Sequence, residues 1–148
     1  MINVIITGVT GQDGSHMCDY LLHHFSSLDK PYKIYGTVRR LSVKNHENIL
    51  HLKNNPNFEL IDMDLSDAHS IRDIIIDVNP DYFINFAAQS FVAGSWKYPV
   101  QTWNTDANAV MDFWSLYVDL LLIVDFIMLD HQKSSVISFI LPKMNFTH

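Results

Sequence analysis

Three glycines near the start of the chain have the spacing of a phosphate-binding turn. Gly8, Gly11 and Gly14 form the pattern G-x-x-G-x-x-G directly after the apolar run at residues 2–6. Such glycines let the chain turn sharply out of a strand and let backbone approach a pyrophosphate. A helix that begins here directs free N–H groups and its positive dipole end at the phosphates. The alternative is an ordinary glycine-rich turn, but its position after an N-terminal strand favours a nucleotide site.

A pair of arginines further along the chain indicates which nucleotide is preferred. Residues 32–38 have the composition of a second strand, and Arg39 and Arg40 follow it directly. In a βαβ unit the end of this strand faces the adenosine ribose, where an acid binds the 2′-hydroxyl of NAD and an arginine accepts the 2′-phosphate of NADP. The pair therefore predicts NADP, with a solvated strand end as the alternative.

The elements that must position these groups alternate between strand and helix patterns. Apolar runs at residues 2–6, 32–38, 58–63 and 82–86 predict four strands. Helical periodicity follows Gly14. It recurs in a second helix that ends at residue 78 and for which Ser66 is the expected N-cap. A short helix is expected within residues 41–54 and another from Pro99. This order predicts the N-terminal part of a Rossmann-like, doubly wound α/β fold, incomplete, with parallel strands in the order 3-2-1-4. Asp64 and Ala87 then fall on the carboxyl edge of the sheet, where ligands bind.

Composition narrows the class of protein. The 148 residues suit one domain, and the net charge of −6 argues against a general nucleic-acid binder. The longest apolar run, residues 116–129, is too short to span a bilayer and contains two aspartates, so no membrane association is expected. The single cysteine, Cys18, is expected to be packed in the first helix and fits a reducing compartment, and no signal peptide is visible, so a cytoplasmic location is expected. The histidines are scattered, and no metal site is predicted.

Five motifs together resemble a known family. They are T-G-V-T-G-Q-D-G-S, V-R-R-x-S, D-x-D-L-x-D, N-x-A-A-Q-S-x-V and S-W-x-x-P-x-x-T, and they lie within residues 1–111. The chain resembles the extended short-chain dehydrogenase/reductase superfamily and, within it, the GDP-mannose 4,6-dehydratases. Two positions depart from that family's pattern: Asn48 replaces an arginine, and Gln101 replaces a tyrosine that touches the cofactor.

The resemblance implies an NADP site and assigns residues to its parts. The pyrophosphate would lie at the glycine-rich turn, the adenosine phosphate at the residues after the second strand, the adenine after the third strand and the nicotinamide after the fourth. In that order the implied residues are Gly8, Thr10, Gly11, Gln12, Asp13 and Gly14; Arg39, Arg40 and Ser42; Asp64 and Leu65; and Phe86, Ala87, Ala88, Gln89 and Ser90.

The resemblance also implies a reaction and partners. Family members use NADP as a hydride shuttle to convert GDP-mannose to its 4-keto-6-deoxy product, and the loop at residues 39–52 reaches a neighbouring subunit in their tetramers. Their chemistry needs a Tyr-x-x-x-Lys pair, a Ser or Thr and a Glu, all beyond residue 111. No Tyr-x-x-x-Lys pair occurs in the tail of this chain, so no catalytic residue is assigned.

Residues 112–148 do not resemble the family and are interpreted as an out-of-frame tail. Permitted codons for residues 125–136, read one base earlier, encode R-F-Y-N-A-G-S-S-E-E-F-G, a run typical of these dehydratases. Loss of one G after the Met111 codon would give this frame. The alternative is a divergent C-terminal helix and strand. On the first interpretation the fifth and sixth strands and the substrate domain are missing or replaced, and the edge of the fourth strand is exposed unless the tail covers it.

Three functional hypotheses follow. The first is a truncated GDP-mannose 4,6-dehydratase that keeps half of an NADP site and is inactive alone. The second is a non-catalytic NADP-binding or subunit-interaction module that joins intact partners through residues 39–52. The third is a dehydratase or epimerase for another nucleotide sugar, since the sugar-contacting residues are mostly absent from the chain. Co-purification with a full-length subunit would favour the second hypothesis.

Overall fold

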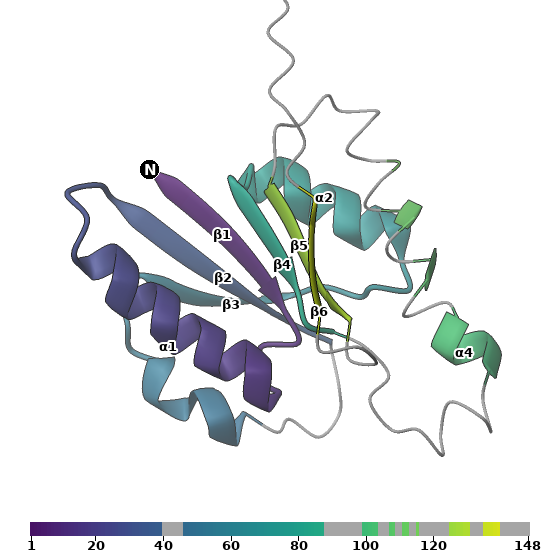
Figure 1. The fold of residues 1–148 in the computed structure, drawn as a ribbon, viewed down its shortest axis with the longest axis horizontal. Coiled ribbons are helices and arrows are strands. Elements are labelled where there is room, and N and C mark those ends of the chain that lie inside the picture. Colours follow the sequence, from purple (N-terminus) through teal and green to yellow (C-terminus); the bar gives the residue numbers. More distant parts are fainter. Residues whose placement is uncertain are drawn as a thin grey trace, which may run out of the picture.

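A computed structural model describes residues 1–39, 46–87, 99–103, 107–108, 111–112, 115, 125–130 and 135–139. Within these ranges the chain forms a six-stranded sheet in the order β3-β2-β1-β4-β5-β6 (Figure 1). The predicted order 3-2-1-4 for the first four strands is confirmed, and these four strands are parallel. The fold is therefore of the open α/β type expected from the alternation of strand and helix patterns.

The first four strands lie close to where the apolar runs predict them. They are β1 (Ile2–Thr7), β2 (Tyr32–Val38), β3 (Phe58–Asp62) and β4 (Tyr82–Asn85). β1 is paired on both sides, with Ile5 opposite Tyr35 of β2 and Phe83 of β4. Central strands of a parallel sheet are buried on both faces, which explains why Val4, Ile5 and Ile6 are consecutive apolar residues rather than alternating with polar ones.

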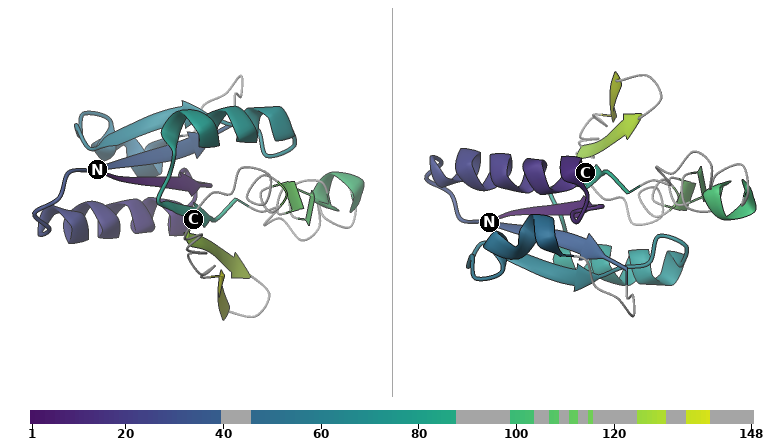
Figure 2. Two further views of the ribbon diagram at one scale, coloured as in Figure 1. Left: turned by 90° about the horizontal axis from the view of Figure 1, so that it is seen from above. Right: turned by 90° about the horizontal axis from the view of Figure 1, so that it is seen from below.

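Helices cover the two faces of the sheet. α1 (Gln12–Ser26) lies on one face and α2 (Ala68–Val78) on the other (Figure 2). The 3-10 helix η1 (Glu47–Leu52) packs in the same hydrophobic cluster as α1. A short helix, α4 (Pro99–Trp103), begins at the proline where a helix was expected. In the described ranges no helix has the length and apolar character needed to cross a membrane.

Two hydrophobic clusters hold these layers together, one on each face. Val4 and Ile6 of β1 point into the cluster beneath α1 and η1, whereas Ile5 points into the cluster beneath α2. Cys18 is fully buried in the first cluster, and burial, aided by the negative charge of Asp19, raises the pKa of its thiol to about 12. The thiol is therefore protonated at neutral pH and inaccessible to solvent. This agrees with the packed position expected for Cys18 in the first helix.

The start of α2 corrects one prediction. Asp67, not Ser66, is the N-cap, and its carboxylate accepts a hydrogen bond of 3.0 Å from the His69 N–H. Ser66 lies one residue before the cap, and its N–H and its hydroxyl both donate to Asp64 Oδ1, over 2.9 and 2.7 Å. The helix ends at Val78, and Asn79 follows as the C-cap in the left-handed conformation (φ 46°), with its N–H donating to the Ile75 carbonyl.

The tail supplies two further strands. β5 (Asp125–Asp130) pairs in parallel with β4, and β6 (Ser135–Phe139) pairs antiparallel with β5. The register places Asp125 opposite Tyr82 and Met128 opposite Asn85. The edge of β4 is thus covered by β5.

Candidate nucleotide-binding site

The turn between β1 and α1 requires glycine at two positions for its own packing. Gly8 has a φ of 65°, and a Cβ there would lie 2.8 Å from the main-chain nitrogen of Ala87. A Cβ on Gly14 would overlap the Gly8 carbonyl group, at 2.8 Å from its carbon. A Cβ on Gly11 would meet only the Gly8 oxygen, at 3.3 Å. Gly8 and Gly14 therefore shape the turn, whereas Gly11 leaves its outer side open to an approaching group.

The N-terminus of α1 presents main-chain donors without a side-chain cap. Gly11 is the N-cap residue, and in the described part of the chain no side chain caps the helix start. The Ser15 N–H is satisfied by the Gly11 carbonyl at 3.1 Å, and the Ser15 hydroxyl donates to the Gln12 carbonyl. Gln12 and Asp13 lie exposed at the start of the helix. An uncapped helix start of this kind is suited to binding an anion.

The next strand pair brings Arg39 and Asp64 to the same edge. The Met63 N–H donates to the Val38 carbonyl at 2.9 Å, which extends the pairing of β2 and β3 up to these two residues. The pKa of the Asp64 carboxyl is lowered, mainly by its hydrogen bonds from the Ser66 N–H and hydroxyl and to a lesser extent by the positive charge of Arg39, while partial burial opposes the shift. Both side chains are exposed, so this edge of the sheet carries an ionised carboxylate and a guanidinium.

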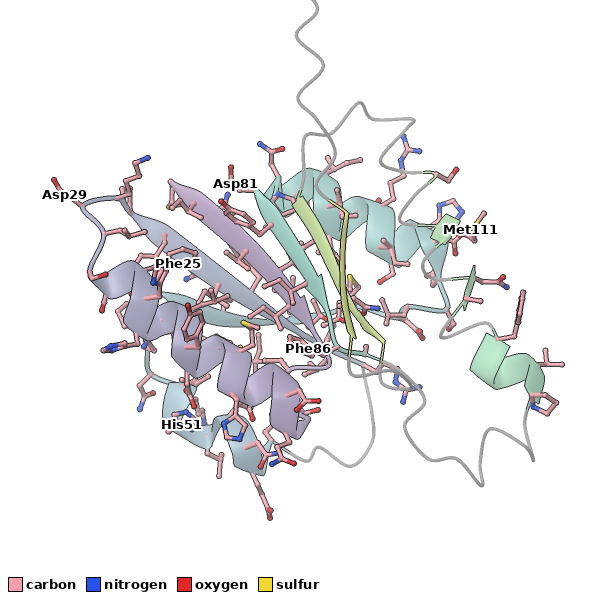
Figure 3. The ribbon with its side chains drawn as sticks, viewed as in Figure 1. Phe25, Asp29, His51, Asp81, Phe86 and Met111 are labelled. Carbon is pink, nitrogen blue, oxygen red and sulfur yellow. The ribbon has the colours of Figure 1, made fainter. Side chains whose placement is uncertain are left out.

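Leu65 and Phe86 are at this edge, but their side chains face the core. Leu65 is 6% exposed and belongs to the cluster under α2, whereas Phe86 is 9% exposed and belongs to the cluster under α1. Their contact with a ligand would therefore come from the main chain. Figure 3 shows Phe86 beside the start of α1, at the opposite end of the sheet from Asp81.

The sequence reasoning overlooked two buried polar residues beside the turn. Thr7 ends β1 and Asn85 ends β4, and the register places them opposite each other. The Thr7 hydroxyl donates to Asn85 Oδ1 and accepts from the Ala87 N–H at 3.1 Å. The sequence signal that could have identified them is that each of two neighbouring apolar strands ends in a polar residue.

A third overlooked contact reaches the turn from η1. The Asn48 side-chain amide donates to the Thr10 carbonyl at 2.8 Å. Asn48 drew attention in the sequence only as a departure from the family pattern, because a contact between residues 38 positions apart cannot be inferred from spacing.

The structure brings most of the predicted site residues together. The carboxyl edge of the sheet holds the described site residues, both in the turn after β1 and in the segments after β2, β3 and β4. Parallel α/β folds bind ligands at this edge. Arg40, Ser42, Ala88, Gln89 and Ser90 lie outside the described residues. No group of three His, Cys, Asp or Glu side chains able to hold a metal ion occurs in the described part of the chain.

The family model and the relatives that match this chain point to the same family. Residues 5–120 match the family model for GDP-mannose 4,6 dehydratase. The GDP-mannose 4,6-dehydratase of Vibrio cholerae is 39% identical over 108 residues, which are 70% of this chain and 27% of that protein. The human GDP-mannose 4,6 dehydratase is 38% identical over 108 residues, which are 69% of this chain and 27% of that protein. The chain therefore spans little more than a quarter of the length of these relatives.

Solved structures show the same fold at lower identity. A dTDP-glucose 4,6-dehydratase from Bacillus anthracis, in complex with NAD, matches 86% of this chain and 37% of its own with a TM-score of 0.69 and 18% identity. A UDP-glucose 4-epimerase from Thermotoga maritima, with UDP-glucose, matches the same shares with a TM-score of 0.67 and 24% identity. These structures support the Rossmann-type fold, and the sequence match supplies the narrower assignment. The chain belongs to the GDP-mannose 4,6-dehydratase family.

Proposed function

We propose that this chain is the NADP-binding part of a GDP-mannose 4,6-dehydratase and does not complete the reaction alone. The observation that carries the proposal is the exposed Arg39 at the carboxyl end of β2, beside an uncapped helix start at Gly11. The helix start is suited to a pyrophosphate, and the arginine to a second phosphate further along the same nucleotide.

The charge at the ribose position favours NADP over NAD. NAD-binding folds of this type place a carboxylate at the end of the second strand, where it accepts from the 2′-hydroxyl. Here that position holds Arg39, and Asp64, on whose carboxyl the charge of Arg39 acts, follows β3. The exposed guanidinium of Arg39 is available to a 2′-phosphate.

In this proposal the chain binds the cofactor but supplies no acid–base group for the reaction. Bound NADP would supply hydride transfer to and from the sugar of GDP-mannose. The described residues bind and orient, because main-chain donors at Gln12 and Asp13 and the charge of Arg39 are suited to phosphates. The Tyr-x-x-x-Lys pair that would move protons at the sugar is absent from the sequence. Removing an acid–base group abolishes the chemical step but leaves binding.

The test is a comparison of NADP and NAD binding by calorimetry, using the full chain and Arg39→Ala. A charge-assisted hydrogen bond contributes about 1.5–3 kcal/mol, so Arg39→Ala should weaken NADP about 10- to 150-fold and leave NAD unchanged. Arg72→Ala is the matched control, because Arg72 is an exposed arginine on α2. Equal affinity of the unaltered chain for NADP and NAD would contradict the cofactor assignment.

Catalysis is tested separately with GDP-mannose and NADP. We expect no 4-keto product from the isolated chain at any enzyme concentration. Turnover by the isolated chain would contradict the proposal that it is a binding part only. Product formed only when a full-length subunit is added, at a rate above that of the full-length subunit alone, would support a second candidate function as an interaction module.

A further inference from the structure

The 3-10 helix η1 is fixed against α1 by apolar and polar contacts. Ile49 and Leu52 are 2% and 4% exposed and lie in the hydrophobic cluster beneath α1. On the surface, His51 Nε2 lies 2.8 Å from Asp19 Oδ1 of α1. Figure 3 shows His51 on η1, alongside the first helix. The position of η1 is therefore set by the core, independently of any ligand.

From this position the Asn48 side chain of η1 reaches the phosphate-binding turn. Asn48 Nδ2 donates to the Thr10 carbonyl oxygen at 2.8 Å. The nitrogen of the same peptide unit, Gly11 N, donates to the Gly8 carbonyl oxygen at 3.0 Å. The Thr10–Gly11 peptide is thus bonded at both of its ends, to η1 on one side and to the end of β1 on the other.

This peptide has an intrinsic freedom that the two bonds remove. Rotation of a peptide unit changes ψ of the residue before it and φ of the residue after it, and glycine accepts nearly any φ. A rotated Thr10–Gly11 peptide would lose both hydrogen bonds and move the N-cap of α1. The direction of the first free N–H groups of the helix depends on that N-cap.

We propose that Asn48 is a positioning residue of the nucleotide site, which fixes the Thr10–Gly11 peptide so that the start of α1 is aligned with the pyrophosphate. The residue does not touch the nucleotide in this account. The inference rests on the proposed NADP-binding function and adds to it a contribution from η1, a segment outside the glycine-rich turn. It assigns to η1 the orientation of the turn rather than a contribution to stability alone.

The central test is Asn48→Leu, which keeps the approximate shape of the side chain and removes the donor. We expect the dissociation constant for NADP to rise about three- to tenfold, the range for one hydrogen bond of ordinary strength. Asn48→Gln, which retains an amide donor, should recover part of the affinity. His51→Leu is the matched control, because it breaks the polar contact of η1 with Asp19 of the first helix and leaves the Asn48 contact with the turn in place.

Fragments of the cofactor locate the effect. ADP carries a pyrophosphate but no 2′-phosphate, whereas 2′-AMP carries a 2′-phosphate but no pyrophosphate. Asn48→Leu should weaken ADP by the same factor as NADP and leave 2′-AMP unchanged. A uniform loss for both fragments, or a loss equal to that in His51→Leu, would show a merely structural role and overturn the proposal.

A measurement without nucleotide separates this inference from the proposed function. In the full chain, amide hydrogen exchange at Gly11 should be at least tenfold faster in Asn48→Leu than in His51→Leu, at equal global stability. Unchanged exchange at Gly11 overturns the positioning role even if NADP binds. Failure of the unaltered chain to bind NADP or ADP would overturn the proposed function and, with it, the role in nucleotide binding, while the exchange result would still decide whether Asn48 fixes the peptide.

Discussion

The hydroxyl of Thr7 donates a hydrogen bond to Asn85 Oδ1 and so joins the last residue of β1 to the last residue of β4. The two residues are 78 positions apart in the chain, and both are buried. The same hydroxyl accepts the Ala87 N–H, at the point where the chain leaves β4 beside Gly8. The glycine-rich turn and the start of the nicotinamide side expected in this family are therefore connected by a single side chain.

Replacing Thr7 by valine should destabilise the fold without changing its shape. Val keeps the β-branched form of Thr but leaves the Ala87 N–H without its partner and removes the donor to Asn85. An unsatisfied buried polar group costs about 1–3 kcal/mol, and urea denaturation should show a loss of that size. Ser26→Ala is the control, since it removes an exposed hydroxyl bonded locally to His23. Equal small losses in the two variants would contradict the assigned role.

Gly14 and Gly11 of the turn should respond differently to alanine. Gly14→Ala places a Cβ against the Gly8 carbonyl group and 2.9 Å from Val9 Cα, so we expect a loss of at least about 1–3 kcal/mol of stability. Gly11→Ala meets only one atom, at 3.3 Å, and should unfold within about 0.5 kcal/mol of the unaltered chain.

Nucleotide binding should separate the two glycine variants further. Gly11→Ala is expected to fold normally but to weaken NADP, because its new methyl group faces the open side of the turn. Thermal unfolding with and without NADP measures both effects in one experiment. A Gly11→Ala chain that binds NADP as well as the unaltered chain would place the pyrophosphate elsewhere.

The lowered pKa of Asp64 predicts a pH dependence of stability with a definite sign. A carboxyl whose pKa is lower in the folded state stabilises the fold above its unfolded pKa of about 3.9, and this contribution disappears as the pH falls through the folded value. Asp64→Asn should therefore be less stable than the unaltered chain near pH 6, and the difference should shrink below about pH 4.

Urea denaturation at a series of pH values measures this difference. Asp73→Asn is the control, because Asp73 is an exposed aspartate on α2 away from the Ser66 hydrogen bonds. Ser66→Ala should raise the Asp64 pKa by removing one of its two donors, which NMR titration of the carboxyl can follow. A stability difference that does not depend on pH would contradict the ionised role of Asp64.

The reading frame of the tail is testable directly. We expect the coding DNA for residues 125–136, read one base earlier, to encode R-F-Y-N-A-G-S-S-E-E-F-G. The measurement is the nucleotide sequence from the Met111 codon onward. A different codon series over this stretch would favour a divergent tail that was always read in the present frame.

The sequence was sufficient to predict the first four strands and their order because each strand carries its own apolar run and each turn its own glycine, proline or aspartate. The position of Asp64 and Ala87 on the carboxyl edge of the sheet could be predicted for the same reason, because each directly follows one of these apolar runs. Local signals of this kind are read within a few residues and need no knowledge of long-range contacts.

Two kinds of feature could not be predicted from the sequence: the choice between two competing N-cap residues, and contacts between segments that are distant in the chain. Ser66 and Asp67 are both good N-caps, and only the structure shows that Asp64 binds Ser66 and leaves Asp67 to cap α2. The contact of Asn48 with Thr10 joins segments that have no shared periodicity. The strand character of residues 125–130 depends on pairing with β4, because an apolar run alone fits a helix or a strand.

The central place of β1 has a consequence for the order in which the chain folds during its synthesis. β1 leaves the ribosome first, yet its pairing with β4 requires Asn85, made 78 residues after Thr7. At about 5–20 residues per second, one edge of the nascent strand stays uncovered for about 4–16 seconds after β1 is made. A pulse-labelled nascent chain should therefore be recognised by hydrophobic-segment chaperones until residue 85 has emerged, and released soon afterwards.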